Sequence, residues 1–449
     1  MNFAYKYLFR NNLFVFSVLF ILALTLRIQL VNPNLDHIYT ARDAKQYIQY
    51  AHNLFQHGVF SRSNSPIDPQ PDSFRSPGYP LYIAFMMWMA GEQSYLMMLV
   101  YSQAVLSALL VPLTFLAGRF FLPFYGALIA AVMVCFSPHL ITIAGCVLTE
   151  TLFSFFLLAS ICCFHYTLKK KPAGLFIFSA ILFGCTCLIN ETALLLPCLL
   201  FIFLFLSKHL AKYHILKKMV LFLMVFSIAP IGWSLRNHLN VPPESEKGMD
   251  RAIVTMSHGA YPDFIYKNPR YKRFPYREDP MQPAFGNSFE NFVQILWARV
   301  KAEPVRYVKW YLVGKAYYLW SWNIIQGVGD VYIYPVGYDI FKDSKSAEIS
   351  KSIMQQLHSF WLLLFWAGIP LFYREFKTIS ADAAILCTPF LHFSTCIYFT
   401  FLYCVFAPWP RYSIPLRAEF YLFCVWSLIA IHKLISSRFR VQGSKVVSD

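Results

Sequence analysis

The sequence predicts an all-α polytopic membrane protein with about ten transmembrane helices and interfacial helices in two large outer loops. Its 449 residues are 57% hydrophobic and 14% charged, whereas soluble domains are closer to half apolar and a quarter charged. Aromatic residues make up 18% of the chain and include 44 Phe, as expected where rings face lipid. A composition this apolar indicates that a bilayer surrounds much of the chain.

Ten apolar runs are long enough to cross about 30 Å of hydrocarbon. They lie at residues 12–31, 94–117, 124–143, 147–167, 173–189, 192–207, 218–235, 356–373, 382–406 and 416–435. The first is too long for a signal peptide and has no small-residue cleavage site, so we expect it to be a retained anchor. Two further apolar stretches, 78–91 and 306–326, are expected to be helices in or against the membrane interface, because the first is short and the second contains two lysines.

Ten spans place both termini on the same side, and the connectors on that side are rich in Lys and Arg. The positive-inside rule therefore predicts that both termini are cytoplasmic. In this topology residues 1–235 form a transmembrane core that includes a first outer loop at 32–93. Residues 236–355 form a larger outer loop, and residues 356–449 form the last transmembrane helices and a cytoplasmic tail. We expect the working surface to lie on the two outer loops.

The net charge of +16 could suggest nucleic acid as a partner. No basic soluble module with exposed aromatic residues is present, so we expect no nucleic-acid binding. In an integral membrane protein such a charge serves orientation and contacts with anionic lipid headgroups or phosphates. Membrane lipids are therefore the expected partners of these cations.

The first outer loop begins with a predicted amphipathic helix. From Thr40 the apolar residues recur at helical spacing, and Gly58 ends the pattern. Thr40-x-x-Asp43 fits a capping box, in which the acid satisfies free backbone N–H groups. Spacing alone therefore leaves Asp43 explained equally well as a helix cap or as a functional acid. Downstream, the prolines and glycine of Arg75-Ser-Pro-Gly-Tyr-Pro predict a turn that brings the chain back to the membrane.

These features, taken in order, resemble the membrane glycosyltransferases of the C superfamily, in particular bacterial proteins similar to protein O-mannosyltransferases and to the aminoarabinose and galacturonic acid transferases of lipopolysaccharide. The resemblance starts with the acid early in the first loop, a helix ending in Asn-Leu-x-x-x-Gly, and the Arg-Ser-Pro-Gly-Tyr-Pro turn. Further motifs are LTETLF at 148–153, WSLRNH at 233–238, GAYPDFIYKNPRY and PYREDP within 259–280, and PRYSIPL at 410–416. Together they extend over most of the chain.

The sequence departs from the family pattern at two places. Asn190 precedes Glu191 where the family often has an arginine before the glutamate, and Asp43-Ala44 replaces the acid pair of the protein mannosyltransferases. The second departure makes a lipid or glycan a better expected acceptor than a protein.

The resemblance implies a sugar donor carried on a polyprenyl phosphate and an acceptor hydroxyl at the outer face of the membrane. The phosphate leaves without a proton, so one general base suffices. Asp43 is the first candidate for this base, with Asp36 as the fallback. Glu150 is expected to be its partner or to bind acceptor hydroxyls, since acids at membrane depth are usually functional; its alternative role is to cap the fourth span.

Arginine forks suit the charge that grows on the leaving phosphate. Arg411 and Arg236, at the ends of spans, are the expected phosphate ligands, and Arg75 could serve similarly or hold the loop. For Arg236 a snorkelling anchor is an open alternative. The remaining expected substrate-binding residues are Tyr412, Glu191 and Asn190.

We expect no obligatory cofactor and no metal. Arginines can neutralise a monophosphate donor without a cation, and the histidines of the first loop lack ligand spacing. The family branch favours a bacterial inner membrane with a periplasmic active site. The alternatives are a lipid-linked saccharide transporter, a scaffold subunit that has lost catalysis, and an oligosaccharide polymerase or ligase. A transporter would predict broken spans at midplane in two related halves, and neither feature is visible.

Overall fold

The computed structural model describes residues 2–65, 67–170, 173–206, 212–263, 279–286, 288–378 and 387–446. Within these ranges the chain is helical, and the only β-type pairings are two isolated bridges, Ser73 with Lys247 and Gly329 with Tyr332. The predicted all-α fold class is confirmed.

The helices follow one another along the chain in three groups. The N-terminal part contains α1 (Asn2–Val31), the 3-10 helix η1 (Asn32–His37), α2 (Asp43–His57), α3 (Gly78–Gly118), α4 (Phe124–Cys135), α5 (Pro138–Ile143), α6 (Glu150–Lys170), α7 (Ala173–Ile189), the 3-10 helix η2 (Glu191–Ala193), α8 (Leu196–Leu206) and α9 (Lys212–Asn240). The middle part contains α10 (Gly248–Gly259), α11 (Gln282–Phe285), α12 (Phe289–Ala302), α13 (Pro304–Lys309), the π-helix η4 (Trp310–Gly314), α14 (Lys315–Leu319) and α15 (Ile340–Asp343). The C-terminal part contains α16 (Lys345–Thr378), α17 (Cys387–Val405), the 3-10 helix η5 (Pro410–Leu416) and α18 (Arg417–Val446).

Several of these helices have the length and composition of membrane spans. Among the described residues five segments qualify, and four shorter apolar helices accompany them. The five are Leu13–His37, Gly78–Gly118, Glu150–Thr167, Leu216–Asn240 and Pro410–Ser436. The chain is therefore a polytopic membrane protein.

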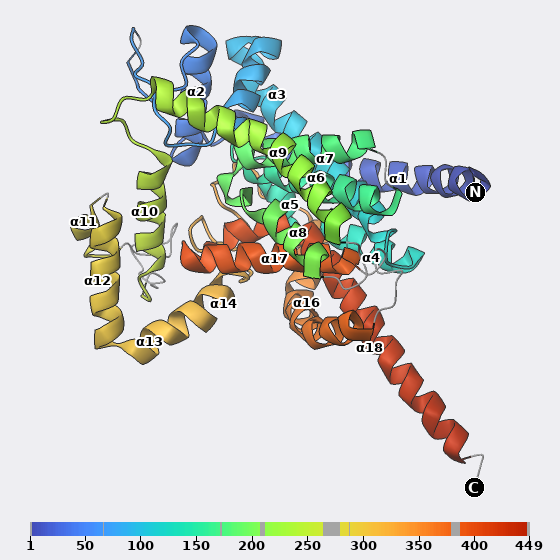
Figure 1. Ribbon diagram of the computed structural model, residues 1–449. Coiled ribbons are helices and arrows are strands. Elements are labelled where there is room, and N and C mark those ends of the chain that lie inside the picture. Colours follow the sequence, from blue (N-terminus) through green and yellow to red (C-terminus); the bar gives the residue numbers. More distant parts are fainter. Residues whose placement is uncertain are drawn as a thin grey trace.

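The helices of the two expected outer loops gather at one end of the molecule (Figure 1). There α2 lies beside the start of α3, and α10 to α13 form a group next to them. The N-terminus of α1 and the C-terminus of α18 project at the opposite end. The two loops are also joined, because Ser73 N donates to Glu246 O at 3.3 Å and Arg62 forms an ion pair with Glu246.

The expected single span at 124–143 is wrong, because the structure divides it into α4 and α5. Pro138 begins α5, and the residue before a proline avoids helical geometry, so Ser137 is extended with ψ 111°. The freed carbonyls at the end of α4 are bound by Arg27 of α1, whose side chain is fully buried. Its Nη1 donates to Cys135 O at 2.8 Å, and its Nε donates to Ser107 Oγ at 3.1 Å.

The stretch 78–91 is the first part of α3. It is joined to the expected span at 94–117 through a kink at Gly91, whose φ of 72° is disfavoured for residues with a side chain. The other stretch, 306–326, contains α13, η4 and α14. Its Lys315 is buried and donates to Cys404 O at 2.7 Å and to Phe406 O at 3.1 Å, so this cation binds carbonyls at the end of α17.

Replacing Arg27 by Met is expected to lower the free energy of unfolding by about 3 kcal/mol, because carbonyls in an apolar interior lose charge-assisted hydrogen bonds. Unfolding of the purified protein in mixed detergent micelles measures this loss. The matched control is Thr25→Val on the exposed face of the same helix, where the hydroxyl bonds only to Ile21 O; it is expected to leave stability unchanged. Equal stability of the two variants would contradict the role given to Arg27.

Candidate active site

Asp43 lies between two arginines that are distant in sequence. Its Oδ1 accepts from Arg75 Nη2 at 2.8 Å, and its Oδ2 accepts from Arg411 Nη2 at 2.8 Å. The side chain of Asp43 is 27% exposed, whereas those of Arg75 and Arg411 are 11% and 16% exposed. The structure thus joins the first loop to the segment before the last span through one carboxylate.

Asp43 does not form the expected capping box with Thr40. The helix begins at Asp43 itself, and its N-cap residue, Arg42, makes no capping hydrogen bond through its side chain. Both carboxylate oxygens of Asp43 are instead engaged by arginines. The carboxylate still lies in the first turn of α2, where the positive end of the helix dipole stabilises negative charge.

The arginines control the protonation of Asp43. Burial acts to raise the pKa of its carboxyl, but the guanidinium groups of Arg75 and Arg411 together outweigh burial and hold that pKa well below its usual range. Asp43 is therefore ionised throughout the neutral and mildly acidic range.

Glu150 is the second acid of the site and the first residue of α6. Its Oε1 lies 3.7 Å from Arg411 Nε, and its Oε2 accepts from Thr149 Oγ1 at 3.3 Å. It is 5% exposed. A short turn after α5 ends directly before Glu150. In this position Glu150 lies next to Arg411, the same arginine that binds Asp43.

Arg75 is held by further contacts besides its ion pair. Its Nε donates to Gln46 Oε1 at 2.9 Å, its Nη1 lies 3.4 Å from Tyr47 Oη, and its guanidinium lies over the Tyr47 ring at 5.0 Å. The turn after it depends on Gly78. A Cβ built at Gly78 would lie 2.8 Å from the backbone of Leu188 and Ile189, so only glycine allows α3 to approach the end of α7 this closely.

Gly78→Ala is expected to cost about 1–3 kcal/mol of stability by overpacking, and to lower transferase activity because Arg75 and Ser76 shift with the turn. The matched control is Gly232→Ala on α9, where a Cβ would meet nothing within 4 Å. That change is expected to stabilise the helix by about 0.5–1 kcal/mol. Thermal unfolding and activity are measured for both variants. A Gly78→Ala variant with the stability and activity of the wild type would contradict the packing argument.

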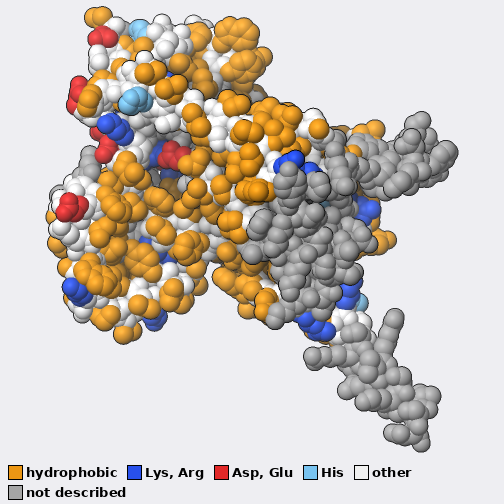
Figure 2. All heavy atoms as spheres, in the orientation of Figure 1, with side chains coloured by type: hydrophobic (Ala, Val, Ile, Leu, Met, Phe, Trp, Pro, Cys, Tyr) orange, Lys and Arg blue, Asp and Glu red, His pale blue; other side chains and the backbone are white. Residues whose placement is uncertain are grey.

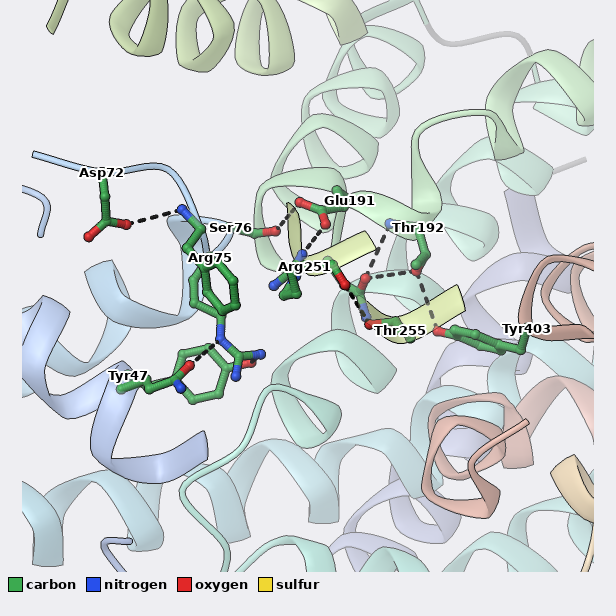
Figure 3. A network of polar contacts seen from close by, with 12 residues as sticks. Tyr47, Asp72, Arg75, Ser76, Glu191, Thr192, Arg251, Thr255 and Tyr403 are labelled. Carbon is green, nitrogen blue, oxygen red and sulfur yellow. Dashed lines mark hydrogen bonds and ion pairs between the residues drawn. The ribbon is translucent and has the colours of Figure 1, made fainter. Parts of the chain in front are cut away.

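Glu191 connects three segments. It accepts from Ser76 Oγ at 2.8 Å and forms an ion pair with Arg251 of α10 (Figure 3). Asn190, the N-cap of η2, accepts from Thr192 N and Thr192 Oγ1. Both residues therefore support the site rather than contact Asp43.

Tyr412 lies against Arg411. The Arg411 guanidinium is 5.3 Å from the centre of its ring, and the other contact of the ring is a stack with Tyr403 at 4.7 Å. Tyr403 in turn approaches Thr192 (Figure 3). This aromatic pair therefore packs beside the guanidinium of Arg411.

Arg236 is placed elsewhere. Its Nη1 donates to Asp72 O at 2.9 Å and its Nη2 to Phe60 O at 3.0 Å, and its guanidinium lies over the rings of Phe60 and Trp233. Among the described residues no ion pair joins it to Asp43 or Glu150. The structure thus gives it contacts that fix the first loop, in place of the expected position beside the base.

The fallback acid, Asp36, also lies apart. It is exposed in η1, and within the described ranges it forms no ion pair with Arg75 or Arg411. The motif residues 264–278, part of the second-loop resemblance, lie outside the described residues.

Sequence reasoning missed Tyr334, which the second outer loop places in this site. Its ring stacks on Tyr39 with centres 4.3 Å apart, and its hydroxyl is buried without a hydrogen-bond partner in the described structure. Burial raises the pKa of its phenol, with Asp43 nearby as a further cause, so the hydroxyl stays protonated. The only sequence signal was a short aromatic run, VYIY at 331–334, before a proline.

A groove opens beside the two stacked tyrosines. Residues 37–41 of the first loop and 335–337 of the second line it. Figure 2 shows, on the side facing the viewer, acidic and basic side chains in a hollow between two lobes covered by hydrophobic side chains. No group of three or more His, Cys, Asp or Glu side chains is placed to hold a metal within the described part of the chain.

Comparison with known proteins identifies this fold. Residues 87–190, which include Glu150, match the family model described as dolichyl-phosphate-mannose-protein mannosyltransferase. No match was found among curated protein sequences. The archaeal oligosaccharyltransferase AglB of Archaeoglobus fulgidus, in complex with an inhibitory peptide and a dolichol-phosphate, aligns with a TM-score of 0.50 and 11% identity over 97% of this chain and 52% of that one. A second structure from Archaeoglobus fulgidus, an oligosaccharyltransferase tethered to an acceptor peptide, aligns with a TM-score of 0.50 and 12% identity over 92% of this chain and 49% of that one.

ArnT of Cupriavidus metallidurans, bound to undecaprenyl phosphate, aligns with a TM-score of 0.39 and 13% identity over 91% of this chain and 76% of that chain. The chain spans about half the length of the two archaeal structures, so these alignments identify the fold alone. The ordered motifs, the family match over 87–190 and the shared fold confirm that the chain resembles the C-superfamily membrane glycosyltransferases.

Proposed function

We propose that this protein transfers a sugar from a polyprenyl-phosphate donor to an acceptor hydroxyl at the outer face of a membrane. The observation that carries the proposal is the group of Asp43, Glu150, Arg75 and Arg411, which combines one ionised acid that solvent can reach with two arginines suited to phosphate. Two buried donors of this group, Arg411 Nε and Tyr334 Oη, have no hydrogen-bond partner among the residues that the structure describes. Buried donors are almost always satisfied, so these two support a ligand with acceptor oxygens.

The reaction is a single displacement at the anomeric carbon. The acceptor oxygen forms a bond to this carbon while the bond from the carbon to the phosphate oxygen breaks. Asp43 takes the hydroxyl proton, and the polyprenyl phosphate leaves with the bonding electron pair. Arg411 and Arg75 stabilise the charge that develops on the leaving phosphate, a role that grows toward the transition state.

Glu150 and Tyr334 are suited to binding the sugar or the acceptor. Glu150 lies at Nε of Arg411, next to the Nη2 atom that binds Asp43, and has acceptor capacity left for a hydroxyl. The groove lined by residues 37–41 and 335–337 includes the chain up to two residues before Asp43 and next to Tyr334, which supports it as a binding surface for the acceptor. With Ala44 in place of a second acid, a lipid or glycan acceptor fits better than a protein.

The cellular setting belongs to the same proposal. The Lys- and Arg-rich connectors support cytoplasmic termini, and the motif set supports a bacterial inner membrane with the site on the periplasmic side. In that setting both the donor and the acceptor reach the site from the bilayer or the periplasm.

The test is a transfer assay on the purified protein in liposomes. Short-chain polyprenyl-phosphate sugars are supplied with extracted membrane glycolipids, and mass spectrometry follows the sugar and the released polyprenyl phosphate. Equal amounts of glycosylated acceptor and free polyprenyl phosphate are expected. Donor that crosses the bilayer with its sugar intact would identify a transporter instead.

A single displacement predicts inversion at the anomeric carbon. The product is expected to carry the sugar in the configuration opposite to that of the donor, because one carboxylate acts as the base and no covalent sugar–enzyme intermediate forms. Nuclear magnetic resonance of the product, with the donor as reference, reports the configuration. Retention would require a nucleophile and would remove Asp43 from the role of simple base.

A further inference from the structure

The candidate base, Asp43, forms ion pairs with the two arginines that the donor phosphate is proposed to bind. One oxygen of the Asp43 carboxylate binds Arg75 and the other binds Arg411, each at 2.8 Å. A guanidinium recognises carboxylate and phosphate oxygens with the same donors. In the donor-free protein, Asp43 therefore fills the position of an anionic ligand.

Asp43 holds one guanidinium nitrogen of each of the two arginines. All three nitrogens of Arg75 have partners, namely Gln46, Tyr47 and Asp43. On Arg411 the Nη2 atom binds Asp43, and the buried Nε has no hydrogen bond. A phosphate that binds both guanidinium groups needs the donors that now hold the Asp43 carboxylate, so the two anions compete for them.

The backbone next to Asp43 is strained. Arg42 has φ 55° and ψ −125°, a region that residues with a side chain rarely adopt. Strain of this kind persists where surrounding contacts enforce it, and it is concentrated at functional sites. The two ion pairs of Asp43 are contacts that can enforce it, and the 27% exposure of the carboxylate leaves solvent on one side into which it can move.

We propose that the Asp43 carboxylate is a resident competitor for the donor phosphate, which displaces it from Arg75 and Arg411 on binding. This inference rests on the proposed function. The displaced carboxylate loses the two cations that suppress its basicity, so Asp43 becomes an effective base only when the donor is present. Donor binding therefore precedes activation of the acceptor, and water is not activated in the empty site.

The test measures binding of decaprenyl phosphate, which carries no sugar, to detergent-purified protein by isothermal titration calorimetry. Asp43→Asn removes the competing charge and is expected to bind decaprenyl phosphate at least tenfold more tightly than the wild type, although its sugar transfer is strongly reduced. The matched control is Glu246→Gln, which makes the same change of net charge in an exposed ion pair with Arg62 of the same loops. It is expected to bind as the wild type does.

A second variant covers the case in which Asp43→Asn does not fold. Asp43→Ala, purified in phosphate buffer and exchanged before use, leaves space for a small carboxylate between the arginines. Acetate is expected to compete with decaprenyl phosphate in this variant and to have no effect on the wild type. Size-exclusion profiles and melting temperatures confirm that the compared proteins are folded.

The outcomes separate this inference from the proposed function. Equal or weaker binding by Asp43→Asn, with acetate inert toward Asp43→Ala, would overturn the displacement while leaving sugar transfer by the wild type intact. Wild-type protein that binds decaprenyl phosphate but transfers no sugar would refute the proposed function alone. If both Asp43→Asn and Glu246→Gln bind decaprenyl phosphate more tightly, the change in net charge alone explains the tighter binding. This result would also overturn the displacement.

Discussion

Asp43→Asn is expected to lower kcat for sugar transfer by about 10²–10⁴-fold, the range that a positioned general base contributes. The amide keeps the size of the carboxylate but cannot accept the proton of the acceptor hydroxyl. The KM for the donor is not expected to rise, because Arg75 and Arg411 remain and have lost a competing anion. The measurement is steady-state transfer with a fixed acceptor and a varied donor, on protein whose melting temperature is also recorded.

Asp36→Asn is the control for this prediction. Asp36 lies on the same loop and is exposed in η1, away from both arginines. Its substitution is expected to leave kcat within about twofold of the wild type, as is usual for surface changes. If Asp36→Asn is inactive while Asp43→Asn is fully active, the catalytic assignment is wrong and the base is Asp36.

The pH dependence follows from the pKa of Asp43. Its folded-state pKa lies below its unfolded value, so its ion pairs contribute their full stability above the ordinary Asp pKa of about 3.9 and lose it as the pH falls further. Protonation of Asp43 in the donor-free site therefore does not limit activity at neutral or mildly acidic pH. The pH profile of kcat/KM reports the free enzyme, and that of kcat reports the enzyme with its substrates bound. If donor binding raises the pKa of Asp43, kcat is expected to fall on the acid side at a higher pH than kcat/KM does.

Much of the fold could be predicted from the sequence because the bilayer imposes a simple rule on length and polarity. Nearly every expected span corresponds to a helix. The break between α4 and α5 was not predicted, although Pro138 is a sequence signal for it. Hydropathy does not register a break when both halves are apolar, and the buried Arg27 that binds the freed carbonyls lies more than 100 residues earlier.

The candidate site was predicted in part. The spacing around Asp43 supported a cap and a base equally, and topology together with the resemblance favoured the base. The contacts of Asp43 with Arg75 and Arg411 join residues 32 and 368 positions apart, a distance that local patterns do not cover. Tyr334 was missed for the same reason, because nothing in VYIY indicates that one ring reaches the first loop.

Arg236 shows why an arginine near a membrane surface is ambiguous. Its position at the outer end of α9 suited a phosphate ligand and an anchor equally. In the structure its donors go to the main-chain carbonyls of Phe60 and Asp72, which fix the first loop to α9. An arginine whose donors go to backbone carbonyls positions a loop, whereas Arg411 faces two carboxylates and has a buried Nε without a hydrogen bond among the described residues, so it is open to a ligand.

The second large effect is expected for Arg411→Ala, which should lower kcat/KM for the donor by about 10²–10³-fold. The change removes the cation that Asp43 and Glu150 share, whose buried Nε has no hydrogen bond within the described part of the chain. Arg411→Lys keeps the charge but loses the fork, so it is expected to recover only part of this loss. Transfer rates and decaprenyl phosphate binding of the two variants check the prediction together.

Arg236→Ala is the variant against which Arg411→Ala is compared, because both remove one arginine at the outer end of a span. If Arg236 only fixes the first loop, Arg236→Ala lowers the melting temperature while the binding of decaprenyl phosphate by the folded protein stays close to wild type. Loss of binding in Arg236→Ala, with normal binding in Arg411→Ala, would exchange the two roles and move the phosphate site to the groove beside Trp233. If only Arg411→Ala loses the binding of decaprenyl phosphate, the phosphate site lies beside Asp43. A single displacement requires this arrangement, because the base, the anomeric carbon and the leaving oxygen must lie in one site.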